Sequence, residues 1–292
     1  MGFFIMVLQA SIVFLFPALG ELFDQRSGVL NIGLEGMVLV GALAAVATSD
    51  ETGNPWLGVV AGMAAGGLLG LIHGFLAISL KVNQVVSGTG IWILGVGLTT
   101  YYGLAYVGPV EHALSPILGK LTPLFFVGLA LVPLFWVILF KTSFGLRVRS
   151  VGEDPSVAEA SGINVSRTRY IGVLIGGILS GLAGAYLILV YSPTWSISWR
   201  VPITEGRGFI ALALVFFSMW RPLLLLAGSF LFGTLWIAGW YLQTVLPGVP
   251  VHILRMIPYL VTAAILVIIS TERFRKRAGA PAALGKPYSP EE

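Results

Sequence analysis

The chain has 292 residues, of which 57% belong to the apolar set AVILMFWYC and only 10% are Asp, Glu, Lys or Arg, and its net charge is +4. A soluble globular domain carries about 25% charged residues, so this chain has too little charge to cover such a surface, and it is far too apolar to be disordered. The composition excludes a soluble enzyme and predicts a protein that crosses a membrane several times.

Residue types that serve metal, redox and nucleotide chemistry are scarce. There is no cysteine, and the three histidines, His73, His112 and His252, lie far apart in the sequence. The phosphate-binding pattern GxxxxGK[ST] does not occur, since Gly119-Lys120-Leu121 lacks both the hydroxyl residue and the upstream glycine. We therefore expect no catalytic group, no metal, no cofactor, no nucleic-acid partner and no ATP binding by this chain.

Apolar segments long enough for a helix to cross the bilayer recur along the chain. They predict an all-α helical bundle of about nine spans, at residues 3–19, 29–47, 57–80, 85–107, 124–140, 170–191, 208–219, 222–246 and 254–270. Cytoplasmic loops carry an excess of Lys and Arg, and alternating the spans puts 13 of the 17 basic residues on one side, leaving Lys120, Arg200, Arg207 and Arg255 on the other. We expect the N-terminus outside, a membrane domain over 1–271, and a cytoplasmic tail over 272–292.

The second and third spans carry ionisable residues, which are costly inside a membrane and therefore candidates for function. Glu35 and His73 are expected at similar depth on the cytoplasmic side, and we predict a hydrogen bond between them. Asn31 lies one turn before Glu35, and with Gly33 and Gly36 it suggests a broken helix that lines a path. The alternative is that backbone groups or water satisfy each polar residue separately.

The third span also has a regular glycine stripe. Its members recur every fourth residue, at Gly58, Gly62, Gly66, Gly70 and Gly74. Such a stripe lets another helix approach closely, so it predicts helix packing and says nothing about a solute.

Residues 141–169 form the longest polar stretch between two spans and predict a short capped helix. Asp154 can cap it with Pro155 at the first helical position, or Ser156 can cap it with Glu159 completing a capping box. Gly162 can end it in the left-handed conformation, and Arg147 and Arg149 precede it. Such a helix is either a stiff lever for a soluble partner or a simple connector.

A second interrupted segment, TEGRGFIALAL, is followed by Met219-Trp220-Arg221-Pro222. The second span is expected to run outward and the seventh inward, and broken spans of opposite direction are typical of inverted repeats. The predicted pairing is spans two to four with spans seven to nine.

Four strings resemble signatures of one transporter family: GELFDQRSGVLNIGLEGMVLVGALAA, VGEDPSVAEASGINVSRTRYIGVLIGGILSGLAGAYL, EGRGFIALALVFFSMWRPL and MIPYLVTAAILV. They are similar to permease subunits of ATP-binding-cassette importers of the branched-chain amino acid, simple-sugar and nucleoside branch, and most to the nucleoside-type subgroup. The resemblance covers about residues 15–270.

This resemblance implies a type II importer permease in the bacterial inner (plasma) membrane. It implies as partners a second related permease subunit in a heterodimer, a cytoplasmic ATP-binding subunit, and an extracytoplasmic substrate-binding protein or lipoprotein. The resemblance favours the interpretation of the short helix in 141–169 as a lever over that of a simple connector. It implies that the residues that couple to the ATPase are Arg147, Arg149, Gly152, Glu153, Asp154, Pro155, Ala158, Glu159 and Gly162. Candidates for the substrate path, as lining or as architecture, are Asn31, Gly33, Glu35, Gly36 and His73.

The leading hypothesis is therefore import of a nucleoside or simple sugar, and branched-chain amino acids are the alternative within the family. Two hypotheses from other classes stay open at this point. One is an ion-coupled secondary transporter that works alone, with Glu35 as proton carrier. The other is an intramembrane enzyme that uses Glu35 and His73.

Overall fold

The computed structural model describes residues 2–196, 202–246, 248–270 and 279–289, and these are predominantly helical. The long helices are α1 (Gly2–Arg26), α2 (Leu34–Thr52), α3 (Pro55–Gly74), α4 (Gln84–Tyr102), α5 (Pro123–Lys141), α8 (Val165–Tyr186), α9 (Arg207–Phe217), α10 (Pro222–Val245) and α12 (Ile257–Ser270). The short elements are η1 (Phe75–Ser79), η2 (Gly103–Tyr106), β1 (Gly108–Pro109), α6 (Ser143–Glu153), α7 (Pro155–Ala160), η3 (Leu187–Tyr191), β2 (Thr194–Trp195) and α11 (Val251–Arg255).

Each of the nine predicted spans overlaps one of these helices. Among the described residues, five helical segments are long and apolar enough to cross a membrane by themselves: Gly2–Arg26, Pro55–Ser79, Pro123–Lys141, Val165–Tyr191 and Pro222–Val245. Helix α9 has 11 residues and α12 has 14, so both are shorter than a full crossing. The chain is thus a multi-span helical protein.

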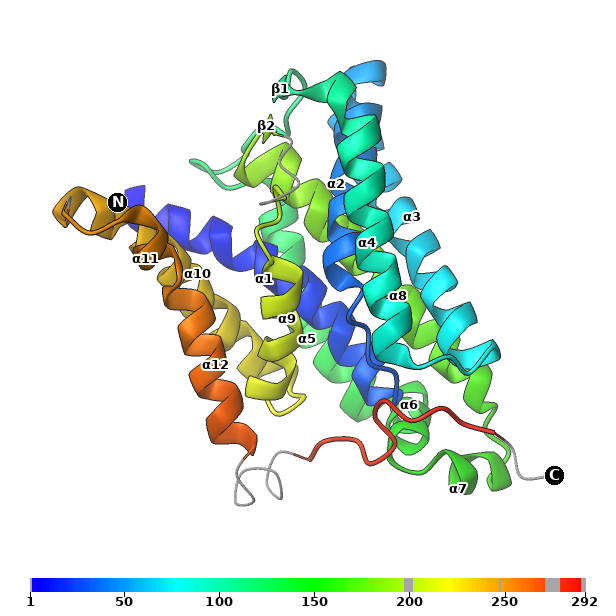
Figure 1. Ribbon diagram of the computed structural model, residues 1–292. Helices are drawn as coiled ribbons and strands as arrows, with labels where there is room; N and C mark the ends of the chain where they lie inside the picture. Colours follow the sequence, from blue (N-terminus) through cyan, green and yellow to red (C-terminus); the bar gives the residue numbers. More distant parts are fainter. Residues whose placement is uncertain (1, 197–201, 247, 271–278, 290–292) are drawn as a thin grey trace.

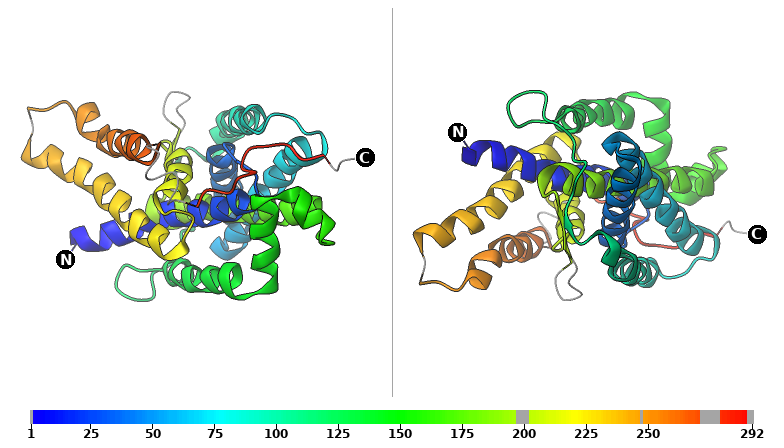
Figure 2. Two further views of the ribbon diagram at one scale, coloured as in Figure 1. Left: turned by 90° about the horizontal axis from the view of Figure 1, so that it is seen from below. Right: turned by 90° about the horizontal axis from the view of Figure 1, so that it is seen from above.

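Helices α1 and α8 pack against each other at the centre (Figure 1). Helices α2 and α3 pack on α8, whereas α9 and α10 pack on α1. The views from below and above show α2, α3 and α4 on one side of this central pair and α10 and α12 on the other (Figure 2). Thus α8, in the second half of the chain, packs against α2 and α3 of the first half. In the same way α1 packs against α9 and α10 of the second half.

The glycine stripe of α3 packs as its spacing predicts. A Cβ added at Gly66 would lie 2.3 Å from the carbonyl oxygen of Gly177, and one added at Gly62 would lie 2.8 Å from the oxygen of Gly41. Real Cβ contacts are not this short, so α3 meets α2 and α8 through backbone. The stripe is confirmed as a packing surface.

Helix α1 is longer than the sequence predicted, since it continues to Arg26 instead of ending near residue 19. Its last two turns include Glu21, Asp24 and Gln25, all fully buried. An apolar run marks where a helix can enter lipid, but it does not mark where the helix ends, because polar residues that pack against neighbours extend it.

Residues 141–169 contain two short helices where one was predicted. Helix α6 precedes α7, and Asp154 separates them by ending one helix and capping the next. The Asp154 carboxylate accepts hydrogen bonds from the Ser156 hydroxyl, at 2.6 Å, and from the Ser156 and Val157 N–H groups. The bond from the Ser156 hydroxyl, followed by the one from Val157, lowers the pKa of Asp154. Asp154 is therefore the cap, Ser156 is not, and Gly162 has the predicted left-handed φ of 81°.

Candidate functional site

Two breaks in the bundle place polar groups deep inside it: residues 27–33, between α1 and α2, and residues 202–206, before α9. At the first break, Asn31 donates through its side-chain amide to Asp24 Oδ2 at 3.0 Å, and its backbone N–H reaches Glu21 Oε1 at 3.3 Å. Its side-chain oxygen accepts the N–H of Gly33 at 3.1 Å. Asn31 thus fastens the broken segment to the end of α1.

The two carboxyl groups beside Asn31 were missed as site candidates by the sequence analysis. Glu21 Oε1 also accepts from the Gln25 side chain at 2.8 Å, whereas Glu21 Oε2 and Asp24 Oδ1 are buried and have no hydrogen-bond partner among the described residues. No Lys, Arg or His of the described chain lies within ion-pair distance of either carboxyl group. Their spacing, three residues apart directly after an apolar run, is the sequence signal that could have identified them.

At the second break, Glu35 caps the N-terminus of α9. Its Oε1 accepts hydrogen bonds from the Thr204 hydroxyl and from the Gly206 N–H, the latter at 2.9 Å, and its Oε2 accepts the Gly208 N–H at 2.7 Å. The free N–H groups at a helix N-terminus favour a carboxylate for both their hydrogen bonds and the helix dipole. A side chain from the start of α2 therefore holds the start of α9.

The predicted hydrogen bond between Glu35 and His73 is wrong. His73 Nδ1 lies 2.9 Å from the Ser87 hydroxyl, and its Nε2 lies 3.3 Å from the Leu30 carbonyl oxygen. The two residues lie on consecutive helices, but His73 faces α4 and the first break, while Glu35 faces α9. Similar depth in the membrane does not make two side chains meet, because the direction in which each one points also depends on the rotation of its helix about the helix axis.

The residues that were predicted to line the substrate path are buried inside the bundle. Asn31, Glu35 and His73 are at most 1% exposed. A Cβ added at Gly33 would lie 3.0 Å from the Ile91 side chain, and one added at Gly36 would lie 2.5 Å from the Ile91 carbonyl oxygen. The structure gathers these residues around the first break and against α4.

Arg207, predicted in an outer loop, is buried at the first residue of α9. Its guanidinium lies 4.1 Å from the ring centre of Trp236, donates to the carbonyl oxygen of Thr204 at 3.0 Å, and forms an ion pair of 3.4 Å with Glu205. A second arginine, Arg255, lies 3.8 Å from the other carboxylate oxygen of Glu205 and 3.9 Å from the ring centre of Trp240.

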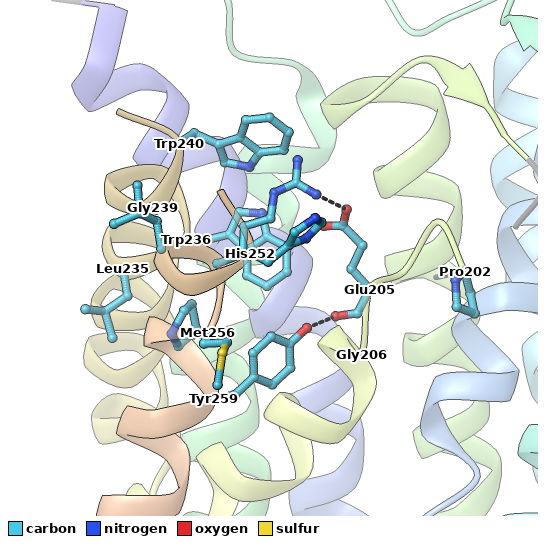
Figure 3. Close-up of a pocket in the computed structure, with 13 residues that line it drawn as sticks. Pro202, Glu205, Gly206, Leu235, Trp236, Gly239, Trp240, His252, Met256 and Tyr259 are labelled. Atoms are coloured by element: carbon cyan, nitrogen blue, oxygen red, sulfur yellow. Dashed lines mark hydrogen bonds and ion pairs between the residues drawn. The ribbon is translucent and has the colours of Figure 1, made fainter. Parts of the chain in front are cut away.

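A cavity of about 350 Å³ lies beside the second break, and Glu205, Trp236, Trp240 and Arg255 are among its lining residues (Figure 3). Its walls come from the 202–206 segment, α10, α11 and the start of α12. The lining residues that carry polar or aromatic groups are Glu205, Trp236, Trp240, His252, Arg255 and Tyr259.

The cavity combines apolar walls with a few convergent polar groups, which is typical of small-molecule sites. Tyr259 donates its hydroxyl to the carbonyl oxygen of Glu205. The Trp236 indole N–H and the Arg255 Nε are buried and have no hydrogen-bond partner among the described residues. A solute with acceptor oxygens and an apolar ring would suit such a lining. None of the predicted path residues is among the lining residues of this cavity.

A separate groove lies at the end of the bundle where α6, α7 and the start of α8 meet. Its volume is about 1000 Å³, and its lining includes Arg147, Asp154, Ala158 and Arg167. Leu146 and Val157 also line it, and they are 57% and 61% exposed. Exposed apolar side chains ringed by charges are typical of a protein interface.

The predicted coupling residues have distinct positions around this groove. Arg147, Glu153, Asp154 and Glu159 are exposed, and Ala158 is on the buried face of α7. Arg149 stacks over the Phe140 ring at 5.2 Å. A Cβ added at Gly152 would lie 2.1 Å from the carbonyl oxygen of Arg26, so α6 touches the end of α1 directly at the first break.

Comparison with known proteins agrees with this architecture. The family model described as branched-chain amino acid transport system, permease component, matches residues 3–270. The chain is 38% identical to the guanosine ABC transporter permease protein NupQ of Bacillus subtilis, over 97% of this chain and 96% of that protein. It is 34% identical to the nucleoside ABC transporter permease protein NupC of Lactococcus lactis subsp. cremoris, over 94% and 92%.

A third relative, TsgC13 of Haloferax volcanii, is provisionally named a glucose ABC transporter permease protein. It is 39% identical over 97% of this chain and 96% of that protein. No solved structure matches the chain. The match of the family model over nearly the whole bundle, together with these relatives, places the chain in the family of permease components of branched-chain amino acid and related ABC transport systems.

Proposed function

We propose that this permease imports a nucleoside or a simple sugar. As an ABC permease component it is a multi-pass subunit of the inner membrane, and ATP hydrolysis belongs to a separate ATP-binding subunit. The relatives named for guanosine, nucleosides and glucose support this choice of solute. The observation in this chain that supports it most is the cavity beside the second break, which is lined by two tryptophan rings and the Glu205 carboxylate.

The chemistry of the cavity fits such solutes. Aromatic rings stack on nucleobases, and a carboxylate accepts hydrogen bonds from sugar hydroxyl groups. The Arg255 guanidinium, on a side chain that is 37% exposed, offers donors to the oxygen atoms of the same solute. A branched-chain amino acid would need partners for both an ammonium and a carboxylate group, and its aliphatic side chain does not need the aromatic rings.

Nine spans with inverted repeats are part of this proposal. Helices α1–α4 would correspond to α8, α9, α10 and α12, which extends the predicted pairing of spans two to four with seven to nine by one helix at the front. The packing supports it, because α2 and α3 rest on α8 as α9 and α10 rest on α1. Because α9 and α12 are short, the second half would cross the membrane as broken helices. The N-terminus would lie outside and the C-terminus in the cytoplasm.

A second permease subunit would cover the face formed by α4 and α12. On α4, a Cβ added at Gly90 or at Gly97 would meet nothing within 4 Å, and Ile93 between them is 61% exposed. On α12, Leu260 is 58% exposed. Small residues beside apolar ones on an open helix face favour close helix packing, which supports a heterodimer.

The cytoplasmic groove and α7 would receive the ATP-binding subunit, with an extracytoplasmic binding protein or lipoprotein delivering the solute on the other side. Asn31, Gly33, Glu35, Gly36 and His73 would act as architecture at the first break, holding the helices that move. The contact of Gly152 with Arg26 gives the coupling segment a direct route to that break.

The test is uptake by proteoliposomes that contain this permease, a second permease and the ATP-binding subunit, supplied with the delivery protein. We expect ATP-dependent uptake of guanosine or glucose that unlabelled isoleucine does not reduce. Uptake of isoleucine instead would establish the branched-chain alternative. Accumulation by this chain alone, without nucleotide, would support a secondary transporter.

The cavity is tested by Trp240→Ala, for which Trp56→Ala is the matched control, because the two side chains are 45% and 47% exposed and Trp56 does not line the cavity. Loss of a stacking partner costs about 1–3 kcal/mol, so we expect the KM for uptake to rise at least about fivefold in Trp240→Ala only. Equal KM values in both variants would remove the cavity from the path.

A further inference from the structure

Residues 279–289, near the C-terminus, lie across the cytoplasmic end of the bundle as an irregular segment with a turn at 282–285 (Figure 1, red). We call residues 279–289 the C-terminal strap. It passes between the first break, the α6–α7 segment and the start of α8. The sequence analysis treated this region only as a tail.

Two backbone hydrogen bonds join the strap to α6 and to the first break, which contact each other through Gly152 and Arg26. The Ala283 N–H donates to the Gly152 carbonyl oxygen at 3.0 Å, and the Gly285 N–H donates to the Gly28 carbonyl oxygen at 3.1 Å. Gly152 is the residue of α6 that touches Arg26, and Gly28 begins the first break with a φ of 89°. The strap therefore bridges the coupling segment and the break.

Side chains anchor the same segment further along. Arg169, which is 1% exposed, donates to the Lys286 carbonyl oxygen at 3.2 Å. The Lys81 ammonium donates to the Ser289 hydroxyl at 2.6 Å, which connects the strap to the loop between η1 and α4. These anchors come from parts of the chain that are more than a hundred residues away in sequence.

Tyr288 links the strap to α7. Its hydroxyl donates to the Glu159 carboxylate, and its ring packs on the small core of Val151, Ala158 and Val165 beneath α7. A six-residue helix is not stable by itself, so its position depends on what packs against it. Tyr288 supplies part of that packing from outside the coupling segment.

We propose that the C-terminal strap positions the coupling helix α7 against the first break, so that a displacement of α7 reaches the start of α2. This inference rests on the proposed role of α7 as the contact for the ATP-binding subunit. Tyr288 is a positioning residue, because it acts through Glu159 and Ala158 and not through the solute.

The experiment measures ATP hydrolysed per solute imported by the complete complex in proteoliposomes. Deletion of residues 279–292 and the single change Tyr288→Ala are expected to raise this ratio at least about fivefold, which corresponds to a coupling free energy of about 1 kcal/mol. Tyr288→Phe keeps the ring packing and should give an intermediate ratio. Lys286→Ala is the control, since its side chain is exposed and only its backbone carbonyl takes part in the anchor.

The position of the strap is checked separately by crosslinking. The chain has no cysteine, so the pair Lys81→Cys and Ser289→Cys can be joined in membranes with a bismaleimide reagent without background. We expect a crosslink, because the Lys81 ammonium contacts the Ser289 hydroxyl. Lys120→Cys with Ser289→Cys should give none.

Two results would overturn the inference: no crosslink in the first pair, or an unchanged ratio in both Tyr288→Ala and the deletion variant. A further variant, Ala158→Pro, distinguishes failure of the inference about the strap from failure of the proposed function. If Ala158→Pro uncouples hydrolysis from uptake while the strap variants do not, only the strap is refuted. If Ala158→Pro also leaves the ratio unchanged, α7 is not the coupling contact.

Discussion

The two breaks of the membrane domain differ in how they are held. The first break, residues 27–33, is enclosed by side chains and backbone on every side: Asn31 bonds to Glu21 and Asp24, Leu30 bonds to Gln84, and Gly28 bonds to the strap. The second break, residues 202–206, is held from within by Glu35 but borders the open cavity.

This difference suggests a division of roles. The enclosed break contacts α6 through Gly152 and Arg26, and in the proposed mechanism it would transmit force from the coupling segment, which requires a fixed geometry. The other break borders the cavity and needs room for a solute. Glu35 joins them, because its backbone belongs to the helix that follows the first break and its carboxylate caps the helix that follows the second.

The largest effect is expected for Glu35→Leu, which removes the link between the breaks. Three buried donors, on Thr204, Gly206 and Gly208, would lose their acceptor, at a cost of about 1–3 kcal/mol for each. We expect little folded protein in size-exclusion chromatography and no uptake. Glu111→Leu, at an exposed position, is the control, and equal folded yield in both variants would contradict the cap.

A similarly severe effect is expected for Gly152→Ala, which acts on the first break only. The new Cβ would lie 2.1 Å from the Arg26 carbonyl oxygen, so α6 must move away from α1. We expect uptake to fall at least about tenfold relative to ATP hydrolysis, measured in proteoliposomes. Gly248→Ala has open space around the added Cβ and should behave as the unchanged protein; a normal ratio in Gly152→Ala would show that this contact transmits nothing.

Asn31→Asp tests whether the first break depends on the amide of Asn31. The change replaces a donor to Asp24 with a third carboxyl group next to Glu21 and Asp24, and buried like charges are unfavourable. We expect the midpoint of thermal unfolding in detergent to fall by about 5 °C or more, as a loss of a few kcal/mol predicts. Asn54→Asp, where either residue can cap α3, should leave the midpoint unchanged.

The smallest effect is expected for Tyr259→Phe at the second break. The variant loses one hydrogen bond to the Glu205 carbonyl oxygen, which contributes about 0.5–1.5 kcal/mol, and keeps the ring in the cavity. Because the bond is present without solute, we expect a small fall in the midpoint of thermal unfolding. We also expect a rise in the KM for uptake of no more than about tenfold, the largest factor that this free energy gives, because the 202–206 wall of the cavity is held less firmly. Tyr101→Phe, on an exposed ring, provides the comparison; a fall in stability without a change in KM would make the Tyr259 bond structural.

Local features of the sequence predicted local structure well. The spacing of glycines predicted the close packing of α3, and Asp154, one of the two predicted caps, starts α7. Both depend on residues within one or two turns, where backbone geometry alone decides the outcome. The helical character of all nine predicted segments followed from apolar length in the same way.

Contacts between distant segments were not predictable in this way. Glu35 finds its partners about 170 residues later in the chain, and the strap meets Gly28 and Gly152 from the C-terminal end. Glu21 and Asp24 seemed to follow the first span because their charge broke the apolar run. Only the packing of α1 against α8 and α9 encloses them.

The sequence by itself determined that this is a helical membrane protein of the importer permease family, because composition, apolar length and signature strings are properties of the chain without reference to its fold. The tertiary structure decided which polar groups meet, because the rotation of each helix about its axis is set by packing against its neighbours. For that reason Glu35 pairs with the start of α9 and not with His73, and the cavity is lined by residues from α10, α11 and α12.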